Sequence, residues 1–229
     1  MSGAVETSGR PGLLLLYGGT FDPVHNGHLA IARAARDRLR RPVRMMPAAD
    51  PPHRPPPGAD ARHRAAMLRL AVAEEPGLSV DLRELERDGR SYTVDTLRAL
   101  RRAEPAAPVA LLMGADSFAG LMSWKDWRDL FSLAHLVVAE RAGNALDDLP
   151  APLAAELDAR GCADPAALEG GPAGRILRLG QPLSGESATG LRALVAAGGD
   201  WRALVPAPVA GYIDRHGLYR DGGDTAAPL

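Results

Sequence analysis

Hydrophobic residues along the chain gather into short uninterrupted runs, separated by longer amphipathic segments. Every position of Leu13–Tyr17, Val109–Met113 and Leu136–Ala139 is apolar. This pattern is typical of strands that are buried on both faces of a parallel sheet. Further strands are predicted over Val43–Met46, Leu78–Leu82 and Ile176–Leu179.

Helices are predicted in the segments between these runs. From about Gly27 to Arg41, apolar residues fall near helical spacing with arginines between them. Asp60 can cap a helix that runs to about Glu75, and Ser123 with Asp126 has the spacing of a capping box for a helix through Phe131. The remaining predicted helices are Thr93–Arg102, Ala151–Arg160, Ser187–Ala197 and Pro206–His216.

Strands that alternate with helices predict an α/β fold, a Rossmann-like, doubly wound and mostly parallel sheet. The length of 229 residues favours a single domain. We expect a flexible N-terminal tail over residues 1–12, the domain over 13–220, and a C-terminal tail over 221–229. Residues 143–174, rich in Ala, Gly and Pro, are expected to form a variable surface insertion.

The charge balance and the single cysteine exclude several classes of protein. The 27 basic and 28 acidic residues nearly cancel, so we expect no nucleic-acid partner. Cys162 cannot form an internal disulfide and has too few partners for a Cys/His metal site. The apolar runs are too short for a membrane span or a signal peptide, and a cytoplasmic location is expected. The sequence leaves room for a homo-oligomer.

The segment that follows the first predicted strand carries the chemistry. It reads G-G-T-F-D-P-V-H-N-G-H-L over Gly18–Leu29. Its glycines let the backbone approach a ligand closely, and the helix after them presents N–H groups and a partial positive charge. His25 and His28 lie at the start of this helix, where both can face a bound anion. The sequence therefore predicts a phosphate site.

This segment resembles the signature of the nucleotidyltransferase superfamily with an H-x-G-H motif, and its longer form is most similar to that of bacterial nicotinate-nucleotide adenylyltransferases. Four further segments resemble that family in the same order: P-P-H-R-P at Pro51–Pro55, S-Y-T at Ser91–Thr93, G-A-D-S at Gly114–Ser117, and S-A-T-G-L-R at Ser187–Arg192. The resemblance extends over nearly all of the chain from Leu13 to Arg220 and implies that residues 13–220 form a nucleotidyltransferase domain.

The resemblance implies that ATP and nicotinate mononucleotide are the substrates, that the adenylyl group of ATP is transferred, and that nicotinate adenine dinucleotide and pyrophosphate are formed on the route to NAD. His25, His28 and Arg192 would be catalytic, because they would stabilise charge on the triphosphate. The ATP site would consist of Gly18, Gly19, Thr20, Phe21, His25, His28, Gly114, Asp116, Ser117, Ser187, Thr189 and Arg192.

The resemblance also suggests an acceptor site. His53 and Arg54 would receive the acceptor's phosphate, and Trp124 would stack on the pyridine ring. Backbone N–H groups at helix starts near Thr93 and Trp124 would hold the nicotinate carboxylate, and Lys125 would add charge attraction. No protein metal site is predicted, so Mg²⁺ would be carried on the phosphates of ATP.

Three alternatives remain open from the sequence. The acceptor could instead be nicotinamide mononucleotide or phosphopantetheine. A nucleotide-binding sensor would keep the pocket but perform no chemistry, and the histidine pair argues against it. A tRNA synthetase fragment is disfavoured, because the chain has no lysine-rich K-M-S-K-S loop.

Overall fold

The structure is a computed structural model that describes residues 12–49, 58–87, 91–140, 146, 148–180 and 186–220. The predicted tails, apart from Gly12, lie outside the described residues, and so do His53 and Arg54.

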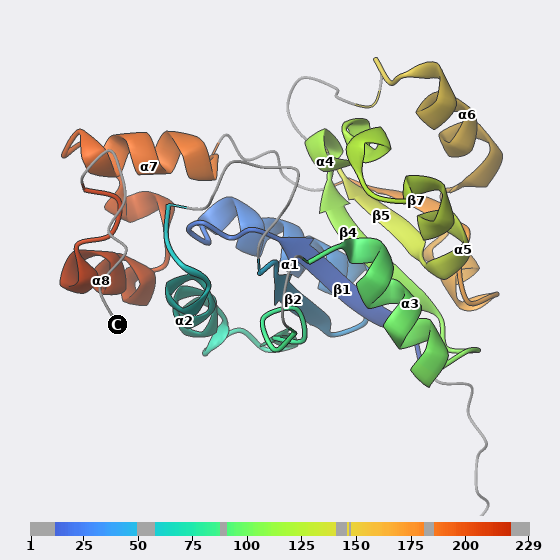
Figure 1. The fold of residues 1–229 in the computed structure, drawn as a ribbon, viewed down its shortest axis with the longest axis horizontal. Coiled ribbons are helices and arrows are strands. Elements are labelled where there is room, and N and C mark those ends of the chain that lie inside the picture. Colours follow the sequence, from blue (N-terminus) through green and yellow to red (C-terminus); the bar gives the residue numbers. More distant parts are fainter. Residues whose placement is uncertain are drawn as a thin grey trace, which may run out of the picture.

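The described residues alternate between strands and helices, as the sequence predicted (Figure 1). The strands are β1 (Leu14–Gly19), β2 (Val43–Pro47), β3 (Leu78–Val80), β4 (Val109–Gly114), β5 (His135–Ala139), β6 (Gly161–Cys162) and β7 (Ile176–Leu179). The α-helices are α1 (Asn26–Leu39), α2 (Ala61–Val72), α3 (Thr93–Ala103), α4 (Ala115–Ala119), α5 (Leu130–Leu133), α6 (Ala151–Arg160), α7 (Ala188–Ala196) and α8 (Ala207–His216). Short 3-10 turns cover Leu121–Ser123, Trp127–Asp129, Pro165–Glu169 and Arg202–Leu204. No helix in the described ranges is long and apolar enough to cross a membrane.

The described strands form one sheet of seven strands in the order β3-β2-β1-β4-β5-β7-β6. Each pairing along this order is parallel. The chain builds outward from β1 in one direction through β2 and β3, and then in the other through β4 and β5. The order therefore reverses between β1 and β4, and in open α/β sheets such a reversal is the usual place for a ligand. The predicted α/β fold is confirmed.

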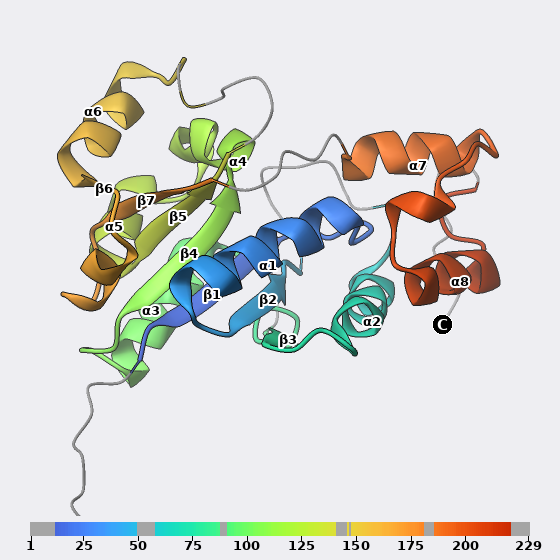
Figure 2. The same ribbon diagram turned by 180° about the vertical axis from the view of Figure 1, so that it is seen from behind.

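Alternate residues of the central strands pack into two separate hydrophobic layers. Leu15 and Leu112 belong to the layer beneath α1, α2 and α8, whereas Leu16 and Leu111 belong to the layer beneath α3 and α5. Helix α3 lies in front of the sheet in Figure 1, and α1 lies in front of it in Figure 2, which shows the molecule from behind. Burial on both faces explains why these strands contain unbroken apolar runs.

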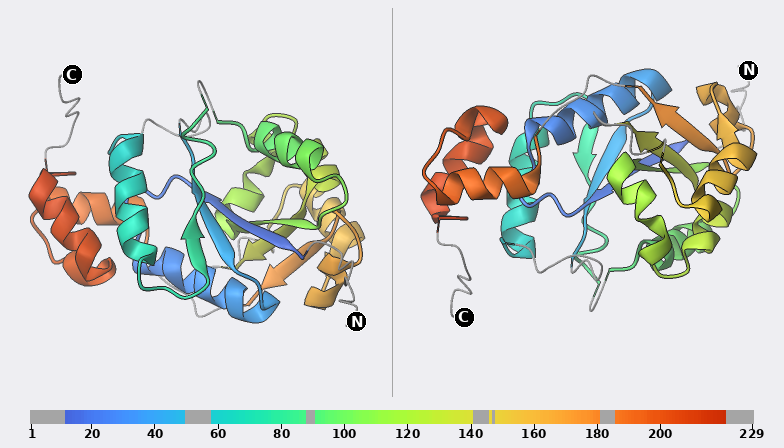
Figure 3. Two further views of the ribbon diagram at one scale, coloured as in Figure 1. Left: turned by 90° about the horizontal axis from the view of Figure 1, so that it is seen from below. Right: turned by 90° about the horizontal axis from the view of Figure 1, so that it is seen from above.

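The two ends of the molecule are built differently (Figure 3). Helices α7 and α8 lie at one end beside α2, and α6 lies at the other end. The predicted helix at Ala151–Arg160 is confirmed. The segment around it lies less on the surface than expected, because Leu153 and Leu168 are fully buried and Gly161–Cys162 pairs with β7.

One predicted helix is wrong. The segment from Ser123 to Phe131 contains a 3-10 turn and then the short helix α5, because Asp126 adopts a left-handed conformation with φ of 48°. The Ser123 hydroxyl donates backward to the Gly120 carbonyl oxygen at 2.8 Å. A left-handed residue ends the helical hydrogen-bond ladder, so the expected capping box does not form.

Candidate active site

A pocket opens at the carboxyl ends of β1 and β4, where the strand order reverses. Residues from β1 and the turn after it meet residues from α3, α4 and the turn before α5. The predicted site residues that line it are Gly18, Gly19, Thr20, Thr93, Ser117, Trp124 and Lys125. The pocket therefore brings together four segments that were predicted separately from the sequence.

The turn after β1 is shaped by an aromatic residue packed against a glycine. A Cβ atom at Gly19 would lie 2.9 Å from the ring of Phe21, so a larger residue would displace that ring. Phe21 itself adopts a left-handed φ of 50° and is 1% exposed. Its ring makes edge contacts with Tyr17 and His28, with centroids 5.4 Å and 5.0 Å apart. The side chain of Phe21 therefore supports the turn, and only its backbone can face a nucleotide.

The two histidines of the motif lie against each other at the start of α1. His25 is the residue before the helix, and the rings of His25 and His28 are 3.7 Å apart between centroids. The backbone N–H of His25 donates to Nδ1 of His28 at 3.2 Å. A nitrogen that accepts a hydrogen bond carries no proton, so the neutral His28 ring has its proton on Nε2. That N–H can donate to a phosphoryl oxygen.

Arg192 from α7 reaches the glycine segment from the far end of the chain. Its Nη1 donates to the Asp22 carbonyl oxygen at 2.7 Å and lies 3.4 Å from the Asp22 carboxylate. Ser187 caps α7 by accepting from the Gly190 N–H at 3.1 Å, and Arg192 Nη2 lies 3.4 Å from the Thr189 hydroxyl. The structure thus joins the S-A-T-G-L-R segment to the H-x-G-H segment.

Asp22 links more of the site than the sequence indicated. Its carboxylate is 3% exposed and accepts from the N–H groups of Gly58 and Ala59, at 2.7 Å and 3.0 Å. It also accepts from the Tyr219 hydroxyl at 2.8 Å. A carboxylate with these donors is satisfied inside the protein. Among the described residues, no group of three or more His, Cys, Asp or Glu side chains could hold a metal ion.

Arg64 is a second buried residue that joins separate segments near the site, and it was not predicted from the sequence. Its side chain is 0% exposed, and its guanidinium donates to the carbonyl oxygens of Thr20, Ala48, Ala49 and Ala59 at 2.7–3.2 Å. These carbonyls belong to the turn after β1, the end of β2 and the start of α2. A signal was present, because Arg64 is in helical register with the apolar residues Met67, Leu68 and Ala71.

One side of the pocket, where the resemblance implies the acceptor, is formed by α3 and the turn around Trp124. Thr93 is the first residue of α3, and Trp124 is half-buried after the 3-10 turn. The N–H of Trp124 donates to the Leu121 carbonyl oxygen at 2.9 Å, so it is already used within that turn. This group is therefore used within the protein, while Thr93 lies at a helix start, and the contact of a carboxylate with N–H groups near Thr93 and Trp124 stays a prediction.

Lys125 has a partner that the sequence analysis did not consider. Its Nζ lies 2.9 Å from Asp95 Oδ2 and 4.7 Å from the centroid of the Tyr92 ring. The Lys125 side chain is exposed, and its ammonium is one side of a network that also contains Arg98 and Asp126. Asp95 offsets much of the positive charge that Lys125 would present to a ligand.

A buried carboxyl lies behind this acceptor side. Glu84 is 3% exposed and accepts from the Thr96 hydroxyl at 2.8 Å. Burial raises the pKa of Glu84, while the hydrogen bond from Thr96 opposes that rise. Ser91 accepts from the Ala49 N–H at 3.3 Å and donates to the Glu84 carbonyl oxygen at 3.4 Å. These contacts connect the end of β2 to the start of α3.

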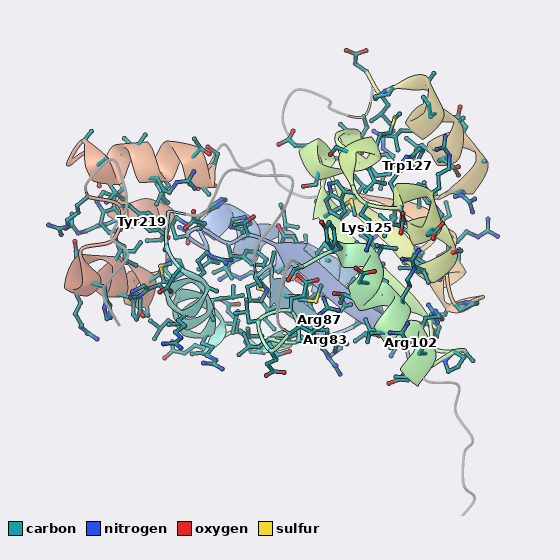
Figure 4. The ribbon with its side chains drawn as sticks, viewed as in Figure 1. Arg83, Arg87, Arg102, Lys125, Trp127 and Tyr219 are labelled. Carbon is teal, nitrogen blue, oxygen red and sulfur yellow. The ribbon has the colours of Figure 1, made fainter. Side chains whose placement is uncertain are left out.

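The other described residues that were predicted for the site are not among those that line this pocket: Phe21, His25, His28, Gly114, Asp116, Ser187, Thr189 and Arg192. Gly114 precedes α4, and Asp116 is exposed in the first turn of that helix. Figure 4 shows Tyr219 between α7 and α8 on one side of β1, and Lys125 on the other side beside the start of α3. The site thus has one side built on Asp22 and Arg192, where the resemblance implies the triphosphate, and another built around Trp124, where it implies the acceptor. We call them the triphosphate side and the acceptor side.

Comparison with known proteins gives consistent matches over this whole region. A family described as cytidylyltransferase-like matches residues 16–191. A protein of Stenotrophomonas maltophilia, named "Probable nicotinate-nucleotide adenylyltransferase", is 58% identical over 215 residues, which cover 91% of this chain and 97% of that protein. A protein of the same name from Xylella fastidiosa is 48% identical, with the same coverage of 91% and 97%.

A solved structure is similar as well. It is that of Plasmodium falciparum nicotinic acid mononucleotide adenylyltransferase complexed with NaAD, which matches with a TM-score of 0.70 and covers 91% of this chain and 97% of that one. The sequences are 15% identical, so this likeness shows a shared fold.

Proposed function

The chain belongs to the nicotinate-nucleotide adenylyltransferase family, and we propose that it transfers the adenylyl group of ATP to nicotinate mononucleotide. The products are nicotinate adenine dinucleotide and pyrophosphate, and the reaction is a step in NAD biosynthesis. The observation that carries this proposal concerns the segment Gly18–Leu29. Its glycines line the pocket that contains Trp124, its His25–His28 pair lies at the start of α1, and Arg192 contacts it at Asp22.

The reaction is an in-line displacement at the α-phosphorus of ATP. An oxygen of the acceptor's 5′-phosphate forms the new bond, and the bond to the bridging oxygen of pyrophosphate breaks. No covalent intermediate with the protein is needed, so the protein contributes positioning and charge stabilisation. His28 donates from Nε2 to the phosphoryl oxygens, and His25 lies beside it.

The triphosphate lies along the start of α7. Arg192 presents a planar, permanently charged fork, and Ser187 and Thr189 offer hydroxyl groups at the same helix start. Gly18, Gly19, Thr20 and Phe21 hold the nucleotide through their backbone. Gly114, Asp116 and Ser117 bind its adenosine part.

The acceptor occupies the opposite side of the pocket. The face of Trp124 stacks on the pyridine ring, and the start of α3 at Thr93 receives the nicotinate carboxylate. His53 and Arg54, which precede Gly58 in the sequence, bind the acceptor's phosphate. Lys125 lies at the rim and contributes weakly to the attraction of a negative ring substituent.

Mg²⁺ accompanies ATP in this proposal and neutralises phosphate charge when bound. The carboxylate of Asp22 accepts from the N–H groups of Gly58 and Ala59 and from the Tyr219 hydroxyl, so its oxygens are directed into the protein. The ion is therefore carried on the phosphates with its own water molecules. We infer a cytoplasmic location, where ATP and mononucleotides are available.

A pyrophosphate-release assay tests the proposal. Purified protein is incubated with ATP and, in turn, nicotinate mononucleotide, nicotinamide mononucleotide and phosphopantetheine. We expect the highest kcat/KM with nicotinate mononucleotide, because the start of α3 favours a negative group. Equal or better use of the amide would contradict the acceptor assignment. Binding of ATP without turnover of any acceptor would contradict the activity.

A further inference from the structure

We propose that Tyr219, near the C-terminal end of the described chain, is a positioning residue of the ATP site that acts through Asp22 on Arg192. The assignment of ATP as the ligand of Arg192 rests on the proposed function. Tyr219 follows α8, and its hydroxyl contacts a residue 197 positions earlier in the chain.

Asp22 is a buried carboxylate that depends on its hydrogen-bond donors. A buried carboxylate needs several hydrogen-bond donors, because burial otherwise disfavours its charged form. Two of its donors, the N–H groups of Gly58 and Ala59, are backbone groups. The Tyr219 hydroxyl, at 2.8 Å, comes from a side chain and can be removed without changing the backbone. Burial, helped by the nearby charge of Asp22, raises the pKa of Tyr219, so its hydroxyl keeps its proton and donates.

Arg192 is held by Asp22 and is also partly exposed. Its Nη1 is 2.7 Å from the Asp22 carbonyl oxygen and 3.4 Å from the carboxylate, yet the side chain is still 32% exposed. The guanidinium is therefore held by Asp22 on one side and open to a ligand on the other. If Tyr219 did not donate to the carboxylate, the carboxylate would draw Arg192 closer and compete with the phosphates for it.

The side chains of Tyr219 and Arg192 pack closely around Gly58. A Cβ atom at this position would lie 3.1 Å from Cδ of Arg192 and 3.2 Å from the ring of Tyr219. Both side chains therefore lie over the same glycine, and the ring of Tyr219 is 8% exposed. Tyr219 also adopts a left-handed φ of 63°, a conformation that persists in non-glycine residues where their surroundings fix it. Figure 4 shows Tyr219 at the end of the molecule where α7 and α8 lie.

Tyr219→Phe tests the proposal, because it removes the hydroxyl and keeps the ring. We expect the affinity for a non-hydrolysable ATP analogue, measured by calorimetry without acceptor, to fall about tenfold, as for loss of a hydrogen bond to a charged group. The KM for ATP rises by a similar factor, and the KM for the acceptor stays the same. The matched control is Tyr212→Phe, which removes a hydroxyl on α8 that contacts His63 and leaves both values unchanged.

A double-mutant cycle separates positioning from a general loss of structure. In an Arg192→Ala background, Tyr219→Phe should cause no further loss of analogue affinity, since it acts through Arg192. Additive losses, equal increases in both KM values, or affinity within twofold of the wild type would overturn the proposal.

A second variant covers the case in which Tyr219→Phe does not fold. Gly58→Ala keeps the hydroxyl but introduces a Cβ atom between Tyr219 and Arg192, and it should also weaken analogue binding several-fold. Unchanged binding in this variant would contradict the proposal. Wild-type protein that binds the analogue but makes no dinucleotide would contradict the proposed function alone.

Discussion

The triphosphate side and the acceptor side of the pocket are held together by different kinds of interaction. On the triphosphate side, Asp22, His25 and Arg64 are at most 5% exposed, and their partners include several backbone groups. On the acceptor side, the ion pairs of Lys125 and Arg98 are exposed. Buried hydrogen bonds to charged groups fix geometry much more firmly than exposed ion pairs do. Rigidity is therefore concentrated on the side where we propose that the adenylyl group is transferred, and the exposed rim around Lys125 can adjust.

The largest effect is expected from His28→Ala on the rigid side. Loss of a positioned donor to the transition-state charge should lower kcat by about 10²–10³-fold, while the analogue affinity and the melting temperature change little. Steady-state rates and thermal melting check this. His63→Ala is the control, since His63 contacts Tyr212 on α8 and lies outside the pocket. Turnover within threefold of the wild type would remove His28 from the mechanism and weaken the contrast between the two sides.

A smaller effect is expected from Trp124→Ala on the acceptor side. Loss of ring stacking costs on the order of 1–2 kcal/mol, so the KM for nicotinate mononucleotide should rise about tenfold and the KM for ATP should not change. Met122→Ala is the matched control, because Met122 is on the same turn and is 41% exposed. A parallel rise in the KM for ATP would show that the two sides are not separable.

Glu84→Gln tests the buried polar contacts behind the acceptor side. Burial raises the pKa of Glu84, so at low pH, where the carboxyl is protonated in both folded and unfolded chains, it carries no penalty for a buried charge. As the pH rises through its folded-state pKa, that protonated form is lost and so is the stability it provided. Glutamine does not ionise.

The variant should therefore melt a few degrees above the wild type at neutral pH. The difference should shrink as the pH falls through the raised folded-state pKa of Glu84, and it should stop changing below about 4.3, the ordinary pKa of a glutamate. Melting curves across this pH range measure it. A difference that grows as the pH falls would contradict the assigned sign.

The smallest effect is expected from Lys125→Ala. Asp95 already offsets its charge, and an exposed ion pair contributes about 0–1 kcal/mol, so kcat/KM for nicotinate mononucleotide should fall about threefold or less. The measurement is the ratio of kcat/KM for the nicotinate and nicotinamide acceptors at low and high salt. A tenfold loss of this preference would show that Lys125 determines acceptor selectivity. The rim would then be as important for geometry as the triphosphate side, and the contrast between the two sides would be lost.

The strands were predicted well because strands that are buried on both faces contain unbroken apolar runs. Val109–Met113 lies within β4, and Ile176–Leu179 coincides with β7. Helix starts were predictable where a local cap exists, and Asp60 does accept from the His63 N–H at 2.8 Å. The failure at Ser123–Phe131 has a local cause that the capping pattern does not reveal, the left-handed conformation of Asp126.

The individual segments of the site could be predicted from the sequence, but the contacts that join these segments could not. The H-x-G-H and S-A-T-G-L-R segments could be identified from the sequence, but the contacts of Asp22 with Gly58 and Tyr219 join residues 36 and 197 positions apart. Such contacts depend on the tertiary fold, and spacing along the chain does not encode them. Lys125 shows the same limit, because its ion-pair partner Asp95 lies on α3, 30 positions earlier in the chain.

The two edges of the sheet are formed by short strands, and this has a consequence for aggregation. The outermost strands β3 and β6 contain 3 and 2 residues, whereas β1 and β4 in the middle contain 6 each. An outer strand offers unpaired N–H and C=O groups as a template on which another chain can add, and a brief strand offers few of them. The short borders should therefore limit strand-to-strand aggregation and protect the protein from polymerising through its own sheet at high concentration.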